Sequence, residues 1–116
     1  PPVFTEKIEM AEEIFRFRKD LESFGISLQD LVRRSPKHRD TRALCAEAAK
    51  AVTASQDLAM KLKTTGRLPV TDLAKQCGLS RKTVELHRRY IIALYLVLIS
   101  DLQIMKNYIG LLEEGE

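Results

Sequence analysis

The chain has 116 residues and a mass of 13.2 kDa, which is the size of one ordinary domain. Hydrophobic residues make up 45% of the sequence, which excludes a disordered segment and allows a sizeable buried core. Nineteen basic residues against sixteen acidic ones give a net charge of +3, and two widely separated cysteines argue against a disulfide-stapled secreted scaffold.

The first two predicted elements are helices separated by a glycine. Apolar side chains recur every three or four residues, which predicts a helix that starts after residue 5 and ends at about residue 23: Met10, Ile14, Phe17, Leu21 and Phe24. Gly25 stops this helix, and Ser27 caps a short second helix with Asp30 three residues later. The second helix has an apolar face made by Leu28, Leu31 and Val32. It ends at Ser35, because the residue before a proline avoids the helical region.

Alanine is concentrated in a third predicted helix that begins near Asp40, where small side chains allow a neighbouring helix to approach closely. These residues are Ala43, Ala46, Ala48, Ala49, Ala51 and Ala54. A break is expected over residues 53–56, followed by an apolar face of Leu58, Ala59 and Leu62 and a stop at residues 64–66. No segment alternates with period two, so the predicted fold class is an all-α multi-helix bundle, with residues 1–116 as a single domain.

Residues 70–90, VTDLAKQCGLSRKTVELHRRY, carry the most informative pattern. We expect Thr71 to cap a short helix over residues 72–77 and Gly78 to end it in the left-handed conformation. Ser80 can then cap a second, longer helix that begins at residue 81. Two helices joined by a short turn with a glycine match the helix-turn-helix motif.

The register of apolar residues supports this interpretation. Ala74 falls where the two helices cross and only a small side chain fits, while Val84 falls on the inward face of the second helix. Cys77 also occupies an apolar position and is interpreted as a small buried hydrophobic residue.

Charge points to the same part of the chain. Residues 61–89 contain eight basic and two acidic residues, whereas residues 1–60 are balanced and residues 90–116 carry a net charge of −3. At 100° per residue, Arg and Glu side chains lie opposite Val84, where Arg suits guanine and Glu can accept from cytosine. Ser80 and Thr83, with the amides of the helix N-terminus, suit a phosphate. The candidate DNA-binding residues are Ser80, Arg81, Lys82, Thr83, Glu85, Arg88 and Arg89. The alternative is a solvated helix face on which Glu85 pairs with Arg88 or Arg89.

Residues 90–99 are apolar on every side of the predicted helix, so other helices or a partner protein must cover them. They make up only about half of the roughly 20 residues that cross a bilayer. No N-terminal segment of this sequence has the charged, apolar and small-residue order of a secretory signal. A last helix is expected over about residues 102–112.

The sequence contains no pattern typical of an enzyme active site. The two histidines and two cysteines, His38, His87, Cys45 and Cys77, lack zinc-ligand spacing. No glycine-rich phosphate loop and no nucleophile elbow is present, so we expect no cofactor and no metal. His87 is interpreted as a histidine at the edge of the core.

Two segments together resemble a known family. The sequence GRLPVTDLAKQCGL–SRKTVELHRRYIIALYLVLIS, with FGISLQDLVRRSPKHRDTR ahead of it, is similar to the C-terminal domain of sigma-I-type alternative sigma factors of bacterial RNA polymerase. Because the first residue is proline rather than methionine, we expect the chain to be a fragment of such a factor. Residues 80–83 match the start of the family's recognition helix, and Glu85, Arg88 and Arg89 match its outward face. Leu86 and His87 depart from the polar or basic residues of the family.

The resemblance implies a function and partners. Such a domain reads the −35 element of promoter DNA while the β flap of RNA polymerase holds it in place. A membrane-spanning anti-sigma factor binds the domain through its short cytoplasmic part, so the chain itself is expected to be cytoplasmic and not inserted in a membrane. The alternatives are a stand-alone, dimeric helix-turn-helix repressor and a purely protein-binding regulatory module.

Overall fold

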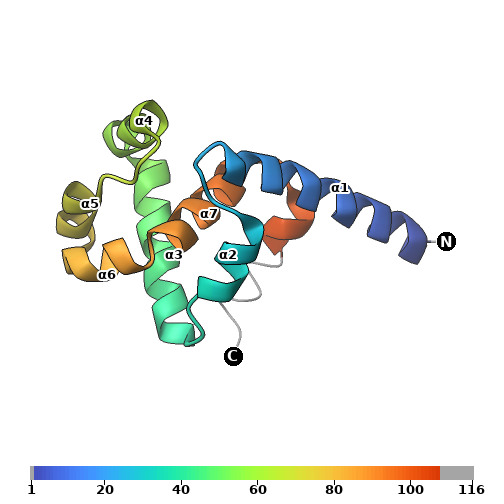
Figure 1. The fold of residues 1–116 in the computed structure, drawn as a ribbon, viewed down its shortest axis with the longest axis horizontal. Helices are drawn as coiled ribbons and strands as arrows, with labels where there is room; N and C mark the ends of the chain where they lie inside the picture. The colour runs from blue at the N-terminus through green and yellow to red at the C-terminus, as the bar shows by residue number, and fades with distance from the viewer. Residues whose placement is uncertain (1, 108–116) are drawn as a thin grey trace.

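The computed structural model describes residues 2–107, with side chains from residue 5 onward, and this part of the chain contains helices and no strands. The helices are α1 (Pro2–Glu22), α2 (Leu28–Arg34), α3 (Arg39–Ala54), α4 (Gln56–Thr65), α5 (Val70–Cys77), α6 (Arg81–Leu86) and α7 (Arg88–Ile99) (Figure 1). A further helical stretch covers residues 103–107, and the remainder of the last predicted helix lies outside the described residues. The all-α prediction is confirmed.

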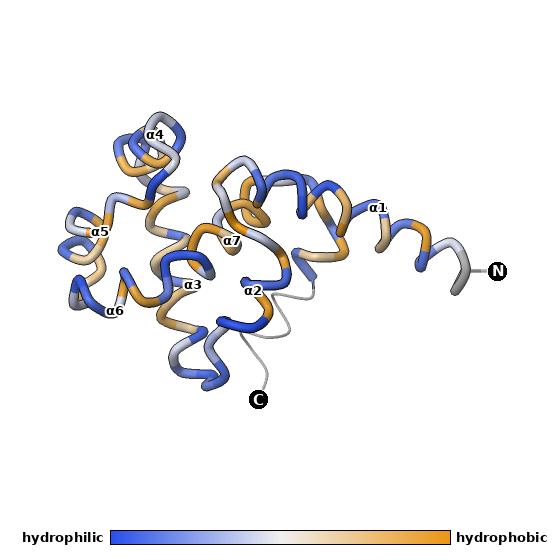
Figure 2. The backbone as a smooth tube through the Cα atoms, in the orientation of Figure 1, coloured by the Kyte–Doolittle hydropathy of each residue, from blue (hydrophilic) through white to orange (hydrophobic). Residues whose placement is uncertain are grey.

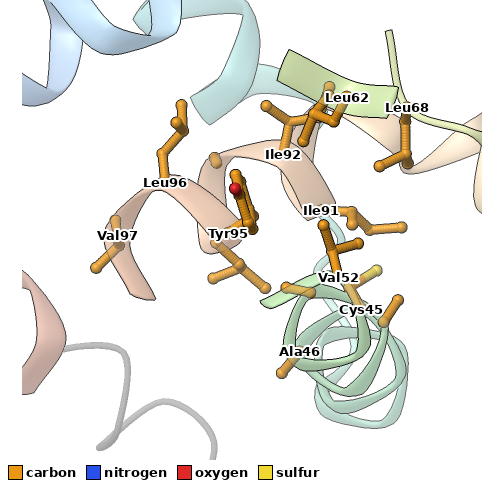
Figure 3. Close-up of a cluster of buried hydrophobic side chains, with 14 of the residues drawn as sticks. Cys45, Ala46, Val52, Leu62, Leu68, Ile91, Ile92, Tyr95, Leu96 and Val97 are labelled. Carbon is orange, nitrogen blue, oxygen red and sulfur yellow. The ribbon is translucent and has the colours of Figure 1, made fainter. Parts of the chain in front are cut away.

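The core is built where α7 crosses α3. Figure 3 shows Ile91 and Tyr95 of α7 facing Cys45 and Val52 of α3, with Leu62 next to Ile92. The alanine-rich face of α3 makes this contact close, since Ala48 and Ala49 are completely buried. Residues 91–97 of α7 are all buried, so helices of the same domain cover most of the apolar segment, whereas Ile99 at its end is 50% exposed.

Serine side chains cap the N-termini of α2 and α4. Ser27 Oγ accepts a hydrogen bond from the backbone N–H of Asp30 at 3.0 Å, and α2 ends at Ser35 as predicted. Ser55 Oγ accepts from the N–H of Leu58 at 3.1 Å. The break between α3 and α4 is therefore a capped helix start, in the expected place.

The first helix begins at Pro2, earlier than predicted, and only its C-terminal half is in the core. Phe17 and Leu21 are buried, whereas Ile14 is half exposed and Phe15 is 58% exposed. In Figure 1 the N-terminal turns of α1 project beyond the other helices, and Figure 2 shows hydrophobic residues continuing into them. The apolar stripe predicted along the whole helix is therefore covered only where α7 lies against it.

Helix α1 is bonded to the segment that follows α7. The carboxylate of Glu13 accepts hydrogen bonds from the backbone N–H groups of Ile104 at 3.1 Å and Met105 at 3.0 Å. These two bonds cap the helical stretch 103–107. Arg16 also forms an ion pair with Asp101, so α1 holds the segment that follows α7.

Two predictions about α2 and α7 are wrong. Val32, which was assigned to the apolar face of α2, is 68% exposed. The long helix predicted from residue 81 is two helices, because α6 ends at Leu86 and α7 begins at Arg88. Between them His87 has φ −107° and ψ 21°, which interrupts the helix. No glycine or proline lies in residues 81–99, so tertiary packing causes the break: α6 packs on α5, while α7 packs on α3, α1 and α2.

None of the helices within residues 2–107 combines the length and the apolar character needed to cross a lipid bilayer.

Candidate nucleic-acid interface

The helix-turn-helix is formed by α5 and α6. The first of these helices begins two residues earlier than expected, because Pro69 rather than Thr71 stands at its N-cap. The N–H of Leu73 donates to the carbonyl of Pro69 at 2.9 Å, so Thr71 lies within the first turn. The proline ring fixes φ near the helical value and orients this turn without a side-chain cap.

The turn between the helices depends on Gly78. Its φ of +69° and ψ of 28° are left-handed, a conformation that costs other residues about 1 kcal/mol or more. The N–H of Leu79 reaches back to the carbonyl of Ala74 at 3.0 Å and closes the end of α5. Ala74 and Val84 are 3% and 0% exposed, so the predicted inward positions are confirmed. Cys77 is only partly buried.

The start of α6 is fixed by the pair Ser80 and Thr83. Ser80 Oγ accepts from the backbone N–H of Thr83 at 3.1 Å, as predicted for the cap, and donates to Thr83 Oγ1 at 2.8 Å. This arrangement leaves the Thr83 hydroxyl proton available to a ligand oxygen.

The outward face of α6 is exposed and basic. With Val84 buried, the 100° rotation per residue places Lys82 and Leu86 on the opposite side of the helix, with Arg81 and Glu85 together on one flank between Val84 and that side. These four side chains are all exposed. Leu86, at 72% exposure, is an apolar residue that the sequence interpretation did not count among the candidates. Leu86 follows Val84 by two residues, or about 200° around the helix, and this spacing alone predicts that it lies on the outward face.

Arg88 and Arg89 do not belong to α6. They belong to α7, beyond the interruption at His87, and both are half-buried. Arg88 Nε lies 3.2 Å from Glu85 Oε2, so the ion pair anticipated in the alternative interpretation is present. The structure therefore places Ser80 at the N-cap of α6 and Arg81, Lys82, Thr83 and Glu85 within it. The two arginines belong to the next helix, where Arg88 remains in contact with Glu85.

A bridge between α4 and α5 positions the motif. Lys61 Nζ lies 2.6 Å from Asp72 Oδ2 and 3.2 Å from Asp57 Oδ2. The hydrogen bond from Lys61 holds the pKa of the Asp72 carboxyl below its usual value, and the same bond raises the pKa of Lys61. The charge of Lys61 is thereby balanced locally. The positive field of residues 61–89 comes from the other basic side chains.

The carboxyl group of Asp30 in α2 lies close to arginines of α2 and α7. Its pKa is lowered first by the hydrogen bond from Arg33, with the charges of Arg33, Arg34 and Arg89 adding to the effect. The effect of Arg89 on Asp30 indicates that α2 lies near the start of α7. No group of three or more His, Cys, Asp or Glu side chains in the described part of the chain is arranged to hold a metal ion.

No family model matches the chain. Similar proteins with curated names are RNA polymerase sigma factors. SigI6 of Acetivibrio thermocellus is 41% identical over 111 residues, which are 96% of this chain and 44% of that protein. SigI4 of the same organism is 40% identical over 109 residues, which are 94% of this chain and 40% of that protein.

A relative from a second genus is also named a SigI sigma factor. SigI of Bacillus subtilis is 36% identical over 104 residues, or 90% of this chain and 41% of that protein. The chain thus spans roughly two fifths of the length of the curated relatives it matches. The predicted resemblance is confirmed: over 90–96% of its length this chain is similar to proteins named SigI-type RNA polymerase sigma factors.

Proposed function

We propose that this chain is the C-terminal, promoter-reading domain of a longer sigma factor, and that it contacts the −35 element through α6. The observation that carries the proposal is the exposed basic face of α6, with Arg81 and Lys82 held outward by a helix-turn-helix whose inward residues are fully buried. The names of the relatives support a role in directing RNA polymerase to promoters.

The geometry of α6 suits a major groove. A groove of B-DNA about 12 Å wide admits one helix, and side chains on the outward face then reach the base edges. Arg81 can donate two parallel hydrogen bonds to guanine, and Glu85 can accept from the amino group of cytosine. Lys82 and the hydroxyl of Thr83 suit the phosphates on either side. Because α6 has only six residues, we expect few contacts and weak binding by the domain alone.

Weak intrinsic binding fits an assembly in which other contacts add to affinity. The partners proposed on the strength of the resemblance are promoter DNA, the β flap of RNA polymerase and the cytoplasmic domain of a cognate anti-sigma factor. These partners place the chain in the cytoplasm. A stand-alone repressor would instead bind a palindromic site as a homodimer, and a light-scattering mass of one chain in solution would count against it.

The proposal is tested by fluorescence anisotropy with a labelled duplex at several salt concentrations. The variant Arg81→Ala/Lys82→Ala should weaken binding at least tenfold, since one bidentate contact to guanine is worth about 1–3 kcal/mol. The matched control is Lys7→Ala/Arg18→Ala, which removes two exposed charges from α1. Equal losses in both variants would leave α6 without a special role and would refute the proposal.

A further inference from the structure

A recess of about 630 Å³ lies beside the junction of α6 and α7. Three separate parts of the chain form its walls: the turn between α1 and α2, the loop between α4 and α5, and the junction itself. The turn between α1 and α2 contributes Gly25, and the loop between α4 and α5 contributes Arg67. The junction of α6 and α7 contributes Glu85, Arg88 and Arg89. Since these parts are far apart in sequence, the recess exists only in the folded domain.

Among the described residues that line the recess, basic side chains outnumber acidic ones: Arg67, Arg88 and Arg89 against Glu85. Arg88 is paired with Glu85 at 3.2 Å. Neither Arg67 nor Arg89 forms an ion pair with a carboxylate among residues 2–107. Two guanidinium groups in the walls are therefore available to a ligand, and a third is held in place by its partner.

The backbone around these arginines is firmly held. Leu68 follows Arg67 and is 7% exposed, and Ile92 lies one helical turn beyond Arg88 and is 3% exposed. Both apolar side chains belong to the core, and both also line the recess. The backbone at both arginines is thus fixed beside buried residues, so a ligand has to order only their side chains.

We propose that this recess is a phosphate-binding site, separate from the outward face of α6, in which Arg67 and Arg89 hold the phosphate oxygens. Guanidinium groups present planar, paired N–H donors that match a phosphate, and these charge-assisted hydrogen bonds are about twice as strong as neutral ones. The recess is much larger than one phosphate group, so it has room for the atoms to which the phosphate is attached.

The phosphate has two possible sources. Glu85 lies on α6 and lines the recess, so a DNA backbone that follows α6 in the groove passes close to the recess. This source rests on the proposed function. The second source is a free phosphorylated molecule, which needs no DNA. The shared chemistry is the phosphate dianion or diester, and the position of Glu85 favours the DNA backbone.

The first arm of the test uses inorganic pyrophosphate as the probe at constant ionic strength. The backbone amide signals of Gly25 and Gly66 are followed by NMR, because both glycines line the recess. We expect saturable shifts with the wild-type chain, and a requirement for at least tenfold more pyrophosphate with Arg67→Ala/Arg89→Ala. The control Lys7→Ala/Arg18→Ala should behave as wild type. The variant Arg67→Lys/Arg89→Lys keeps the charge and should bind at an intermediate concentration.

The second arm measures duplex binding against salt concentration. Loss of phosphate contacts at Arg67 and Arg89 should reduce the slope of log K against log salt by about one for each contact. A change in both arms identifies the DNA backbone as the occupant, and a change in the pyrophosphate arm alone identifies a free phosphorylated molecule.

No change in either arm, with the NMR spectra showing a folded variant, would overturn the phosphate site while leaving the role of α6 intact. Conversely, unchanged duplex binding by Arg81→Ala/Lys82→Ala would refute the proposed function, and the pyrophosphate arm would still test the recess.

Discussion

Lys61 Nζ on α4 lies 2.6 Å from Asp72 Oδ2 on α5, and this contact joins the helix-turn-helix to the helix before it. Asp57 shares the same ammonium group at 3.2 Å. Both acidic side chains and the lysine are exposed, so water and salt screen the attraction. The contact positions α5 more than it stabilises the fold.

The first prediction concerns pH. The pKa of Asp72 is lowered from 3.8 by its hydrogen bond with Lys61, so the pair stabilises the fold above about pH 3.8. This contribution is lost as pH falls through the lower folded-state pKa. Asp72→Asn should therefore lower the melting temperature slightly at pH 6, and the difference from wild type should shrink as the pH falls below 3.8. The measurement is thermal unfolding followed by circular dichroism.

Salt provides the control for this prediction, since about 1 M NaCl reduces the screening length to about 3 Å. The difference between wild type and Asp72→Asn should then shrink at pH 6. A difference that is the same at every pH would show that the substitution acts through packing and not through charge.

The second prediction separates folding from binding at the start of α6. Ser80→Ala removes the cap on the N–H of Thr83 and should destabilise the domain by about 1 kcal/mol in denaturant unfolding. Ser80→Asp keeps a capping oxygen but adds a negative charge to the proposed DNA-facing side. It should retain near wild-type stability while duplex binding falls. Full duplex binding by Ser80→Asp would indicate that DNA does not approach this end of α6.

The third prediction tests the close approach of α3 and α7. Ala48 and Ala49 are 0% exposed, so a larger side chain has no room. Ala49→Leu should destabilise the domain by about 1–3 kcal/mol, the usual cost of overpacking. Ala43→Leu is the matched control on the same helix, because Ala43 is exposed. Equal unfolding free energies for the two variants would contradict the packing described at this crossing.

The fourth prediction concerns the two free thiols. Burial raises the pKa of the Cys45 thiol to about 11, and Cys45 is 3% exposed. Cys77 also has a raised pKa, chiefly from burial, but is only partly buried. At pH 8 a thiol-specific reagent should therefore modify Cys77 well before Cys45, which mass spectrometry of peptides resolves. Simultaneous modification of both would indicate that the native core opens on the timescale of the reaction.

Local signals in the sequence predicted the elements of the motif well. Ser27 and Ser80 cap helices, and Gly78 takes the left-handed conformation, because each residue type acts on its immediate neighbours. These preferences need no knowledge of the rest of the fold. The inward positions Ala74 and Val84 followed from the spacing of the motif and are confirmed by their burial.

Errors arose where distant parts of the chain decide the outcome. His87 has no helix-breaking chemistry, and the helix ends there because α6 and α7 pack on different partners. The predicted common face of Arg81 and Arg89 depended on one uninterrupted helix, so the recess beside Arg89 was not foreseen. Ile14 and Val32 have suitable spacing for burial, but no described helix covers them fully. Periodicity predicts which side of a helix is apolar and does not predict what covers it.

The last prediction uses the ion pair between Glu85 and Arg88. Glu85→Gln removes the negative charge on the α6 face and releases Arg88. Because both side chains are partly or fully exposed, the stability of the fold should change by less than about 0.5 kcal/mol. Binding to a duplex of arbitrary sequence should become tighter, and its dependence on salt steeper, since the basic surface loses its local counter-charge.

A selected, high-affinity duplex gives the opposite expectation if it contains a cytosine read by Glu85. A carboxylate accepts from the cytosine amino group, whereas the variant amide can also donate and fits other bases. Glu85→Gln should then reduce the preference for that duplex over an arbitrary one by about 1–3 kcal/mol. The two affinities are compared at the same salt concentration. An equal gain for both duplexes would limit Glu85 to a role in the charge balance and leave base reading to Arg81.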